Sequence, residues 1–277
     1  MKLMMSIFWL MILLFQASNN CGIEVIEKMI EKNKDLHSLK VDVYIKERIK
    51  DKIMEKQNKF IIRQQPFAIY FTDKRMGLDI EGLYCSPWKK ALIATKGFPW
   101  MKLELDPLDM KMRNETHHTI YEAGFSYFIT ILDAYKNKFG NSFSSMVSCP
   151  GLFQKGNVQY YKIVIDNPDF TYREYIVKKG ENLYDIARRY HVNDYMILEK
   201  NNLRNYGDIH EGQKILIPSE YAKKMILHVE KNNYIPLYIE LYDDKGFYAS
   251  YFFNNISLNP KLDDTVFDAN NSSYHFK

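Results

Sequence analysis

The stretch YIVKKGENLYDIARRYHVNDYMILEKNNLRNYGDIHEGQKILIPS, residues 175–219, has the pattern of a small closed unit. It opens on a short β-type run, and Gly180 then allows a turn that a residue with a Cβ makes only at a cost. A helix with Asn182 as its cap is predicted next. The apolar residues that form one face of this helix, at i, i+3, i+4 and i+7, are Leu183, Ile186, Ala187 and Tyr190.

A second helix is predicted from Asp194, its cap candidate, to about Lys200. A polar loop at 204–212 and a closing strand at 214–217 come next, and Pro218 stops the strand because proline has no backbone N–H to donate. The predicted order is therefore strand, helix, helix, strand.

This order closely resembles the LysM module, a small βααβ domain that in its family binds glycans containing N-acetylglucosamine, such as peptidoglycan and chitin. One departure is Glu181-Asn182, where the family usually has aspartate followed by threonine or serine. The pair keeps an acid and a small capping group. The residues that match the family pattern are Tyr175, Val177, Gly180, Leu183, Ile186, Ala187, Tyr190, Val192, Ile197, Asn201, Leu203, Ile209, Gly212, Gln213, Ile215, Ile217 and Pro218.

The resemblance implies a shallow glycan groove between the turn after the first strand and the loop before the last strand. Such loops offer backbone hydrogen bonds and an apolar floor to an acetamido group, and we expect Tyr206 to stack on a sugar face. The predicted glycan-binding residues are Gly180, Glu181, Asn182, Leu183, Tyr206, Gly207, Asp208 and Ile209. The helical pattern also places Leu183 in the core, and we expect Asn201 to hold loop backbone rather than sugar.

Residues 1–19 are predicted to be a signal peptide. Lys2 precedes an uncharged apolar run, 3–15, which is shorter than the about 20 residues of a membrane-spanning helix. We therefore expect an exported protein without a transmembrane helix in the mature chain, in the periplasm of a diderm bacterium and open to association with the outer membrane. Cys21 would carry the lipid of a lipoprotein, but Ser18-Asn19-Asn20 stands where such a site needs small apolar residues.

The charge distribution excludes one class of partner. The net charge of +4 is spread along the chain without a basic tract, which argues against a nucleic-acid partner.

Cys85 and Cys149 leave two readings open: a disulfide formed in an oxidising compartment, or two separate buried thiols.

The sequence on both sides of the small unit is rich in β-type alternation, with predicted strands at 158–165 before it and 224–230 after it. A domain whose ends lie close together can sit in a loop of another domain. The residues after the unit would also have little core of their own. We therefore predict a discontinuous β-rich domain, 20–170 and 222–277, interrupted by a LysM domain at 171–221. A predicted helix at 121–139 carries an aromatic and aliphatic stripe that fits the core.

The flanking sequence resembles a family of exported bacterial proteins that is in turn similar to the lipoprotein carriers LolA and LolB. The resemblance implies an α+β fold, in which a curved, half-open antiparallel β-sheet carries helices on its concave face. In the carriers the concave face forms a cavity that holds acyl chains. The alternative for this chain is a filled core without a ligand. The stretches that carry the resemblance are RQQPFAIYF, GLYCSPWKKALIA, LDPLDMKMR, HHTIYEAGFSYFITIL and the closing IPLYIELYDDKGFYASYFFNNISLNPKLDDTVFDANNSSYHF.

No catalytic pattern stands out in the chain. His117 and His118 are adjacent, which places their rings on different faces rather than on one metal, and we expect surface or capping roles for them. There is no nucleophile elbow and no Gly-rich phosphate loop, so we predict a protein that is not an enzyme and needs no metal or cofactor.

The predicted function is a non-enzymatic cell-envelope protein that binds peptidoglycan through its LysM module, with a body that takes lipid or lipoprotein. One alternative is an envelope scaffold in which the module contacts a protein partner. A less favoured alternative is an accessory protein of a cell-wall hydrolase.

Overall fold

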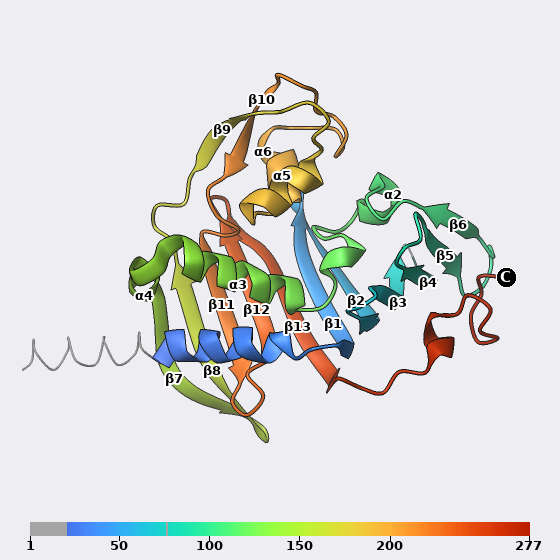
Figure 1. Cartoon of the computed structure of the whole chain (residues 1–277), viewed down its shortest axis with the longest axis horizontal. Helices are drawn as coiled ribbons and strands as arrows, with labels where there is room; N and C mark the ends of the chain where they lie inside the picture. Colours follow the sequence, from blue (N-terminus) through green and yellow to red (C-terminus); the bar gives the residue numbers. More distant parts are fainter. Residues whose placement is uncertain (1–20, 76) are drawn as a thin grey trace, which may run out of the picture.

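A computed structural model describes residues 21–75 and 77–277, so the predicted signal peptide lies outside the described residues. In this part of the chain eleven strands form one antiparallel sheet in the order β6-β5-β4-β3-β2-β1-β13-β12-β11-β8-β7 (Figure 1). Its edge strands, β6 and β7, do not pair with each other, so the curved sheet stays open, as predicted. The strands are β1 (Ser38–Ile49), β2 (Lys52–Arg63), β3 (Ala68–Arg75), β4 (Leu78–Cys85), β5 (Ala91–Thr95), β6 (Lys102–Leu105), β7 (Val147–Lys155), β8 (Val158–Asp166), β11 (Lys224–Glu230), β12 (Pro236–Asp243) and β13 (Gly246–Leu258).

The strands follow from alternation of apolar and polar residues. In β1 the side chains of Val41, Val43 and Ile45 are buried on the concave face, while those between them point outward. The charged segment after β1 forms a hairpin, because Ile49 pairs with Lys52 across a two-residue turn.

Strand β7 was not predicted, since Pro150 and Gly151 interrupt its sequence. The register with β8 shifts between Ser148 and Gly151, so the proline sits at an irregularity. Proline is tolerated there because β7 is an edge strand with no partner on its outer side.

Two helices lie side by side across the concave face (Figure 1). They are the N-terminal helix, residues 21–34, and α3 (Ser126–Phe139), and Lys136 Nζ of α3 lies 2.6 Å from Glu27 Oε1 of the first helix. α3 begins later than the predicted residue 121, because Gly124 has a positive φ of 79° that ends any helix before it. The buried side of α3 is Tyr127, Phe128, Ile129, Ile131, Leu132 and Tyr135. Shorter helical segments are α2 (Met110–Arg113), α4 (Phe143–Met146) and the 3-10 turns Ile120–Glu122, Gly140–Ser142 and Asp264–Phe267.

The cysteine pairing differs from the reading in which Cys85 bonds Cys149. A disulfide joins Cys21 to Cys149, with their Cα atoms 5.9 Å apart, and Cys85 is a free thiol. The reason is topological: Cys85 ends β4 and Cys149 lies in β7, near opposite edges of the sheet. The bond fastens the N-terminal helix to the edge strand.

The small unit sits between two strands that are neighbours in the large sheet. β8 and β11 pair in antiparallel fashion, ending with Asp166 opposite Lys224. The connecting segments continue this pairing, since Asn167 N donates to Lys223 O at 2.8 Å and Ser219 N donates to Thr171 O at 2.8 Å. The unit itself has a separate two-stranded sheet. Its elements are β9 (Tyr172–Ile176), α5 (Leu183–Tyr190), α6 (Asp194–Lys200) and β10 (Lys214–Pro218).

The second helix of the unit packs against the body. Tyr195, Met196 and Leu198 of α6 are buried, and one continuous apolar core includes residues of both parts. Figure 1 shows the unit seated above the ends of the central strands. The two parts therefore share a core and form one packed structure. No helix among residues 21–75 and 77–277 is long and apolar enough to cross a membrane.

Candidate functional site

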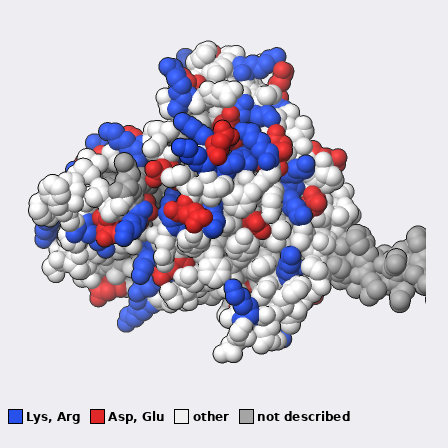
Figure 2. Space-filling model, turned by 180° about the vertical axis from the view of Figure 1, so that it is seen from behind, with Lys and Arg blue, Asp and Glu red and all other residues white. Residues whose placement is uncertain are grey.

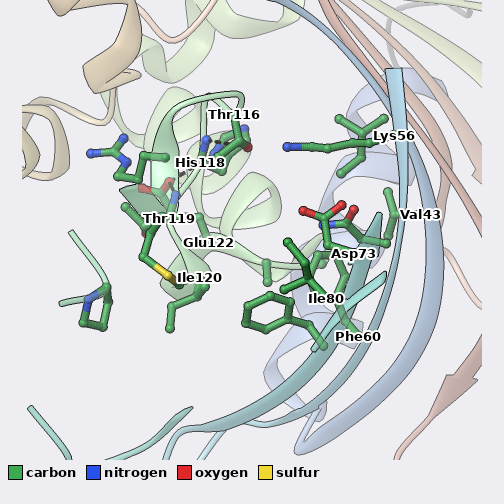
Figure 3. Close-up of a pocket in the computed structure, with 18 of the residues that line it drawn as sticks. Val43, Lys56, Phe60, Asp73, Ile80, Thr116, His118, Thr119, Ile120 and Glu122 are labelled. Carbon is green, nitrogen blue, oxygen red and sulfur yellow. Dashed lines mark hydrogen bonds and ion pairs between the residues drawn. The ribbon is translucent and has the colours of Figure 1, made fainter. Parts of the chain in front are cut away.

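A cavity of about 340 Å³ lies on the concave face, between the sheet and the segment that leads from α2 to α3 (Figure 3). Most of its wall is apolar, a composition typical of small-molecule sites. Val43, Phe60 and Ile80 reach into it from the sheet, and Ile120 faces them from the opposite segment. The cavity is thus a space into which an apolar ligand fits.

One part of the cavity wall is polar. Figure 3 shows Lys56 and Asp73 on the sheet side, with His118 and Glu122 on the facing segment. The Glu47 carboxylate, which also lines the cavity, accepts a hydrogen bond from Tyr251 OH at 2.8 Å and lies 3.8 Å from Lys56 Nζ. Polar groups of both signs therefore stand at one end of an otherwise apolar space.

His117 is buried and His118 is half-buried, which corrects the prediction of surface or capping roles. His117 stacks between Tyr195 and Tyr248, at ring-centroid distances of 4.5 and 4.1 Å, and its Nε2 lies 2.9 Å from the carbonyl oxygen of Arg48. Burial lowers the pKa of His117 to about 4, although Glu47 opposes this shift. His117 is therefore a neutral ring whose Nε2–H donates to the carbonyl near pH 7.

His118 points the other way, into the cavity. Its Nδ1 lies 3.1 Å from Glu122 Oε2 and its Nε2 lies 3.2 Å from Tyr221 OH. Burial alone lowers the pKa of His118, but the hydrogen bond and the charge of Glu122 outweigh it and raise the pKa. The expectation that the two rings occupy different faces is confirmed. Within the described ranges, no group of three or more His, Cys, Asp and Glu side chains is arranged to hold a metal ion.

A buried ion pair joins the small unit to the cavity wall. Arg113 Nη2 donates to Asp194 Oδ1 at 2.5 Å, and the two side chains are only 1% and 3% exposed. The Arg113 guanidinium also lies over the ring of Tyr206, 3.6 Å from its centroid. Asp194 is therefore an interface residue, and Asn193 caps α6 in its place by accepting from Tyr195 N at 3.0 Å.

A second contact runs beside the first. Arg188 of α5 lies over the ring of Tyr127, 4.1 Å from the centroid, and its Nη1 lies 3.9 Å from Glu122 Oε1. Arg113, Glu122 and Tyr127 all line the cavity. Figure 2 shows basic and acidic side chains side by side over the small unit and the body below it. Arg113, Glu122 and Tyr127 therefore line the cavity and also contact the small unit.

Tyr206 does not have the position expected for a sugar-stacking residue. Its side chain faces Arg113 and the residue is 9% exposed. A ring in this position offers no face to a ligand in solution. Nothing in the sequence of the loop distinguishes this inward orientation from the outward one, because the partner, Arg113, is distant in the chain.

Gly180 is the exposed residue of the first predicted glycan loop, and the half-buried side chains of Glu181 and Asn182 support the loop itself. Glu181 accepts hydrogen bonds from Tyr175 OH at 2.8 Å, Lys178 N at 2.9 Å and Arg189 Nη1 at 2.5 Å. Burial would raise the pKa of Glu181, and these hydrogen bonds outweigh it and lower the pKa to about 2. Asn182 caps α5 by accepting from Asp185 N at 2.9 Å, as predicted.

Backbone groups are what this loop presents to solvent. Gly180 is exposed with a φ of 78°, and Leu183 is fully buried in the core of the unit. Val177 N donates to Gln213 O at 2.9 Å, and Gly212 N donates to Val177 O at 2.8 Å. The residues before the first predicted loop therefore lie beside the residues after the second.

The second loop is partly exposed around Gly207. Arg204 Nη2 donates to Asp208 Oδ1 at 2.9 Å, and Asn205 Oδ1 accepts from Gly207 N at 2.9 Å. Ile209 is half-buried. Asn201 bridges backbone as predicted, because its side chain donates to Leu216 O and accepts from Leu216 N, both at 2.7 Å.

Comparison with known families concerns this small unit first. Residues 175–218 match the LysM domain. The LysM domain of this chain therefore contains α5, α6 and most of the two-stranded sheet. A search of curated proteins found no match.

Solved structures resemble the chain as a whole at low identity. LprF from Mycobacterium bovis is 11% identical with a TM-score of 0.44, covering 88% of this chain and 96% of that protein. LppX, a lipoprotein from Mycobacterium tuberculosis, is 9% identical with a TM-score of 0.41, covering 88% and 99%. A LolA superfamily protein from Nitrosomonas europaea is 10% identical with a TM-score of 0.33, covering 89% and 97%. At this level of similarity the roles of individual residues do not transfer.

Proposed function

We propose that the chain is a non-enzymatic protein of the cell envelope that binds peptidoglycan through its LysM domain and an acyl chain through its body. In this proposal the LysM domain spans 171–221 and the body consists of 20–170 and 222–277. The protein acts in the periplasm of a diderm bacterium. The observation that carries the proposal is a LysM domain packed on the wall of a mostly apolar cavity.

The glycan contact is formed mainly by backbone groups of the two loops, at Gly180 to Leu183 and at Gly207 to Ile209. Glu181 and Asn182 hold the first loop in shape through their side-chain hydrogen bonds. Tyr206 is left out of this site because it packs on Arg113. An acetamido group needs backbone donors and acceptors, and the side-chain hydrogen bonds within the loops hold that backbone in a fixed shape.

A retention assay on purified sacculi tests the glycan contact. Gly207→Trp adds a bulky side chain to the second loop, where a Cβ meets only Asn205 Oδ1 at 3.4 Å and the fold has room. We expect this variant to be retained at least tenfold less than the unmodified chain. Lys214→Trp, at an exposed position on β10 of the same domain, is the matched control. Equal retention of both variants would refute the glycan contact.

The cavity of the body is proposed to hold the acyl chain of a lipid or lipoprotein. Its volume lies in the range of about 300–1,000 Å³ of small-molecule sites, and its wall is mostly apolar. Native mass spectrometry after gentle purification tests this claim by showing a co-purifying lipid mass. Ile80→Trp fills the cavity and should abolish that mass, whereas Ile53→Trp, on the exposed side of β2, should keep it. A protein that carries no lipid in either form would favour the scaffold function instead.

A further inference from the structure

The loop between β5 and β6 exposes two large aromatic side chains. Phe98 is 77% exposed and Trp100 is 69% exposed, the highest values for large apolar residues in the described part of the chain. Their rings contact each other edge to face, with centroids 5.4 Å apart. An exposed pair of this size marks a surface that contacts an apolar partner.

Hydrogen bonds of the Thr95 hydroxyl and of the backbone hold this loop in shape. Thr95 Oγ1 accepts from Met101 N at 2.9 Å and donates to Gly97 O at 3.0 Å, and Trp100 N donates to Gly97 O at 2.7 Å. Lys96 N donates to Asp79 O of the neighbouring strand at 2.8 Å. The aromatic pair is therefore presented on an ordered hairpin tip, and little conformational freedom is lost when a partner covers it.

Apolar surface runs from this tip into the cavity. Met101 and Leu103 follow Trp100, and both line the cavity while being 43% and 44% exposed. Ile93, on the preceding strand, lines the cavity as well. The tip is thus part of the cavity rim, and an acyl chain can pass along one apolar path between the tip and the interior.

The charge of the tip fits an anionic surface. The segment KGFPWMKL, 96–103, contains Lys96 and Lys102 and no acidic residue. Lys102 is exposed, and Lys96 Nζ lies 3.8 Å from Glu81 Oε2. Tryptophan and phenylalanine beside lysine are typical of segments that lie at a bilayer interface, with the rings at headgroup depth and the ammonium groups near lipid phosphates.

We propose that this loop inserts Phe98 and Trp100 into the headgroup region of an anionic lipid bilayer and so places the cavity rim against the membrane. The proposal rests on the proposed lipid-binding function of the body. It names the surface with which the cavity exchanges its ligand, a contact that needs neither the LysM domain nor a membrane-spanning helix.

Flotation with vesicles of phosphatidylethanolamine and phosphatidylglycerol tests the contact on the chain without the predicted signal peptide, because the apolar run at 3–15 would itself bind lipid. We expect the unmodified protein to float with these vesicles, and the double variant Phe98→Ser, Trp100→Ser to bind at least tenfold more weakly. The control is Leu152→Ser, Phe153→Ser, an exposed apolar pair on β7 at the other edge of the sheet, which should float like the unmodified protein. Vesicles of phosphatidylcholine alone, or high salt, should weaken binding because the lysine contribution is lost.

Fluorescence gives a second readout at the tip itself. Trp9 lies in the predicted signal peptide, so in the mature chain with Trp88→Phe only Trp100 remains. We expect its emission to shift to shorter wavelength when the anionic vesicles are added. Native mass spectrometry of the tip variant separates this proposal from the lipid cavity, since the variant should still carry co-purified lipid. Unchanged Trp100 emission, or equal flotation of the tip variant, would overturn the membrane contact and leave the cavity proposal standing. If the unmodified protein carries no lipid but still binds vesicles, the cavity proposal is refuted and the membrane contact stands.

Discussion

Replacing Arg113 by methionine removes the cation at the contact between the LysM domain and the cavity wall. Methionine keeps most of the length of the side chain but leaves the Asp194 carboxylate, 3% exposed, without its partner. Breaking a buried pair in this way costs about 3–5 kcal/mol of unfolding free energy, because the remaining charge stays desolvated. The contact with the Tyr206 ring is lost as well.

The expected size of the effect is large enough to measure by two methods. For a chain of this length we expect Tm to fall by roughly 10 °C in thermal unfolding followed by circular dichroism. Urea unfolding should give the same ranking through its midpoint, with the slope unchanged.

A second variant shows whether the charge or the packing carries the effect. In the double variant Arg113→Met, Asp194→Leu both charges are gone, and a pair of apolar residues at such a site is often neutral or stabilising. We therefore expect the double variant to recover most of the lost stability. A single variant that costs less than about 1 kcal/mol, or a double variant as unstable as the single one, would refute the claim that a desolvated ion pair holds the LysM domain on the body.

Three further predictions concern the body. The pKa of His117 is about 4 when folded and about 6.5 when unfolded, so the unfolded state binds more protons between these values and stability falls as pH drops from 6.5 to 4. The loss from this group is about 3 kcal/mol, and His117→Gln should remove that part of the pH dependence in urea unfolding at pH 7 and pH 4. Gly82→Ala places a Cβ 2.2 Å from the buried ring of Phe71 and should cost about 1–3 kcal/mol by thermal unfolding, which the added change Phe71→Leu should relieve. Cys149→Ser should lower stability by about 2–4 kcal/mol by removing the disulfide, whereas Cys85→Ser should leave Tm unchanged and so identify the bonded cysteine.

Local patterns predicted much of this fold. The alternation in 158–165 predicts β8, and the spacing of Leu183 and Ile186 predicts α5, because these patterns depend only on neighbours in the chain. The open curved sheet and the LysM domain came from resemblance to known families, and the structure has both.

Features that depend on distant residues were not predictable in the same way. Tyr206 turns inward because Arg113 receives its ring, and Cys149 bonds Cys21 because β7 lies beside the N-terminal helix. His117 is buried because rings from two other elements enclose it. The candidate cavity likewise depends on how the sheet curves, which a strand pattern does not state.

In the proposed tethering through the LysM domain, the pairing of β8 with β11 has a mechanical consequence. Both connections to the LysM domain leave the body at the same end of two adjacent paired strands, at Asp166 and Lys224. A pull on the tether is therefore divided between two strands and acts along their length. Each strand can slide only by breaking the hydrogen bonds to its outer neighbour, β7 or β12, all at once, so the load meets a shear geometry rather than the opening of one bond after another.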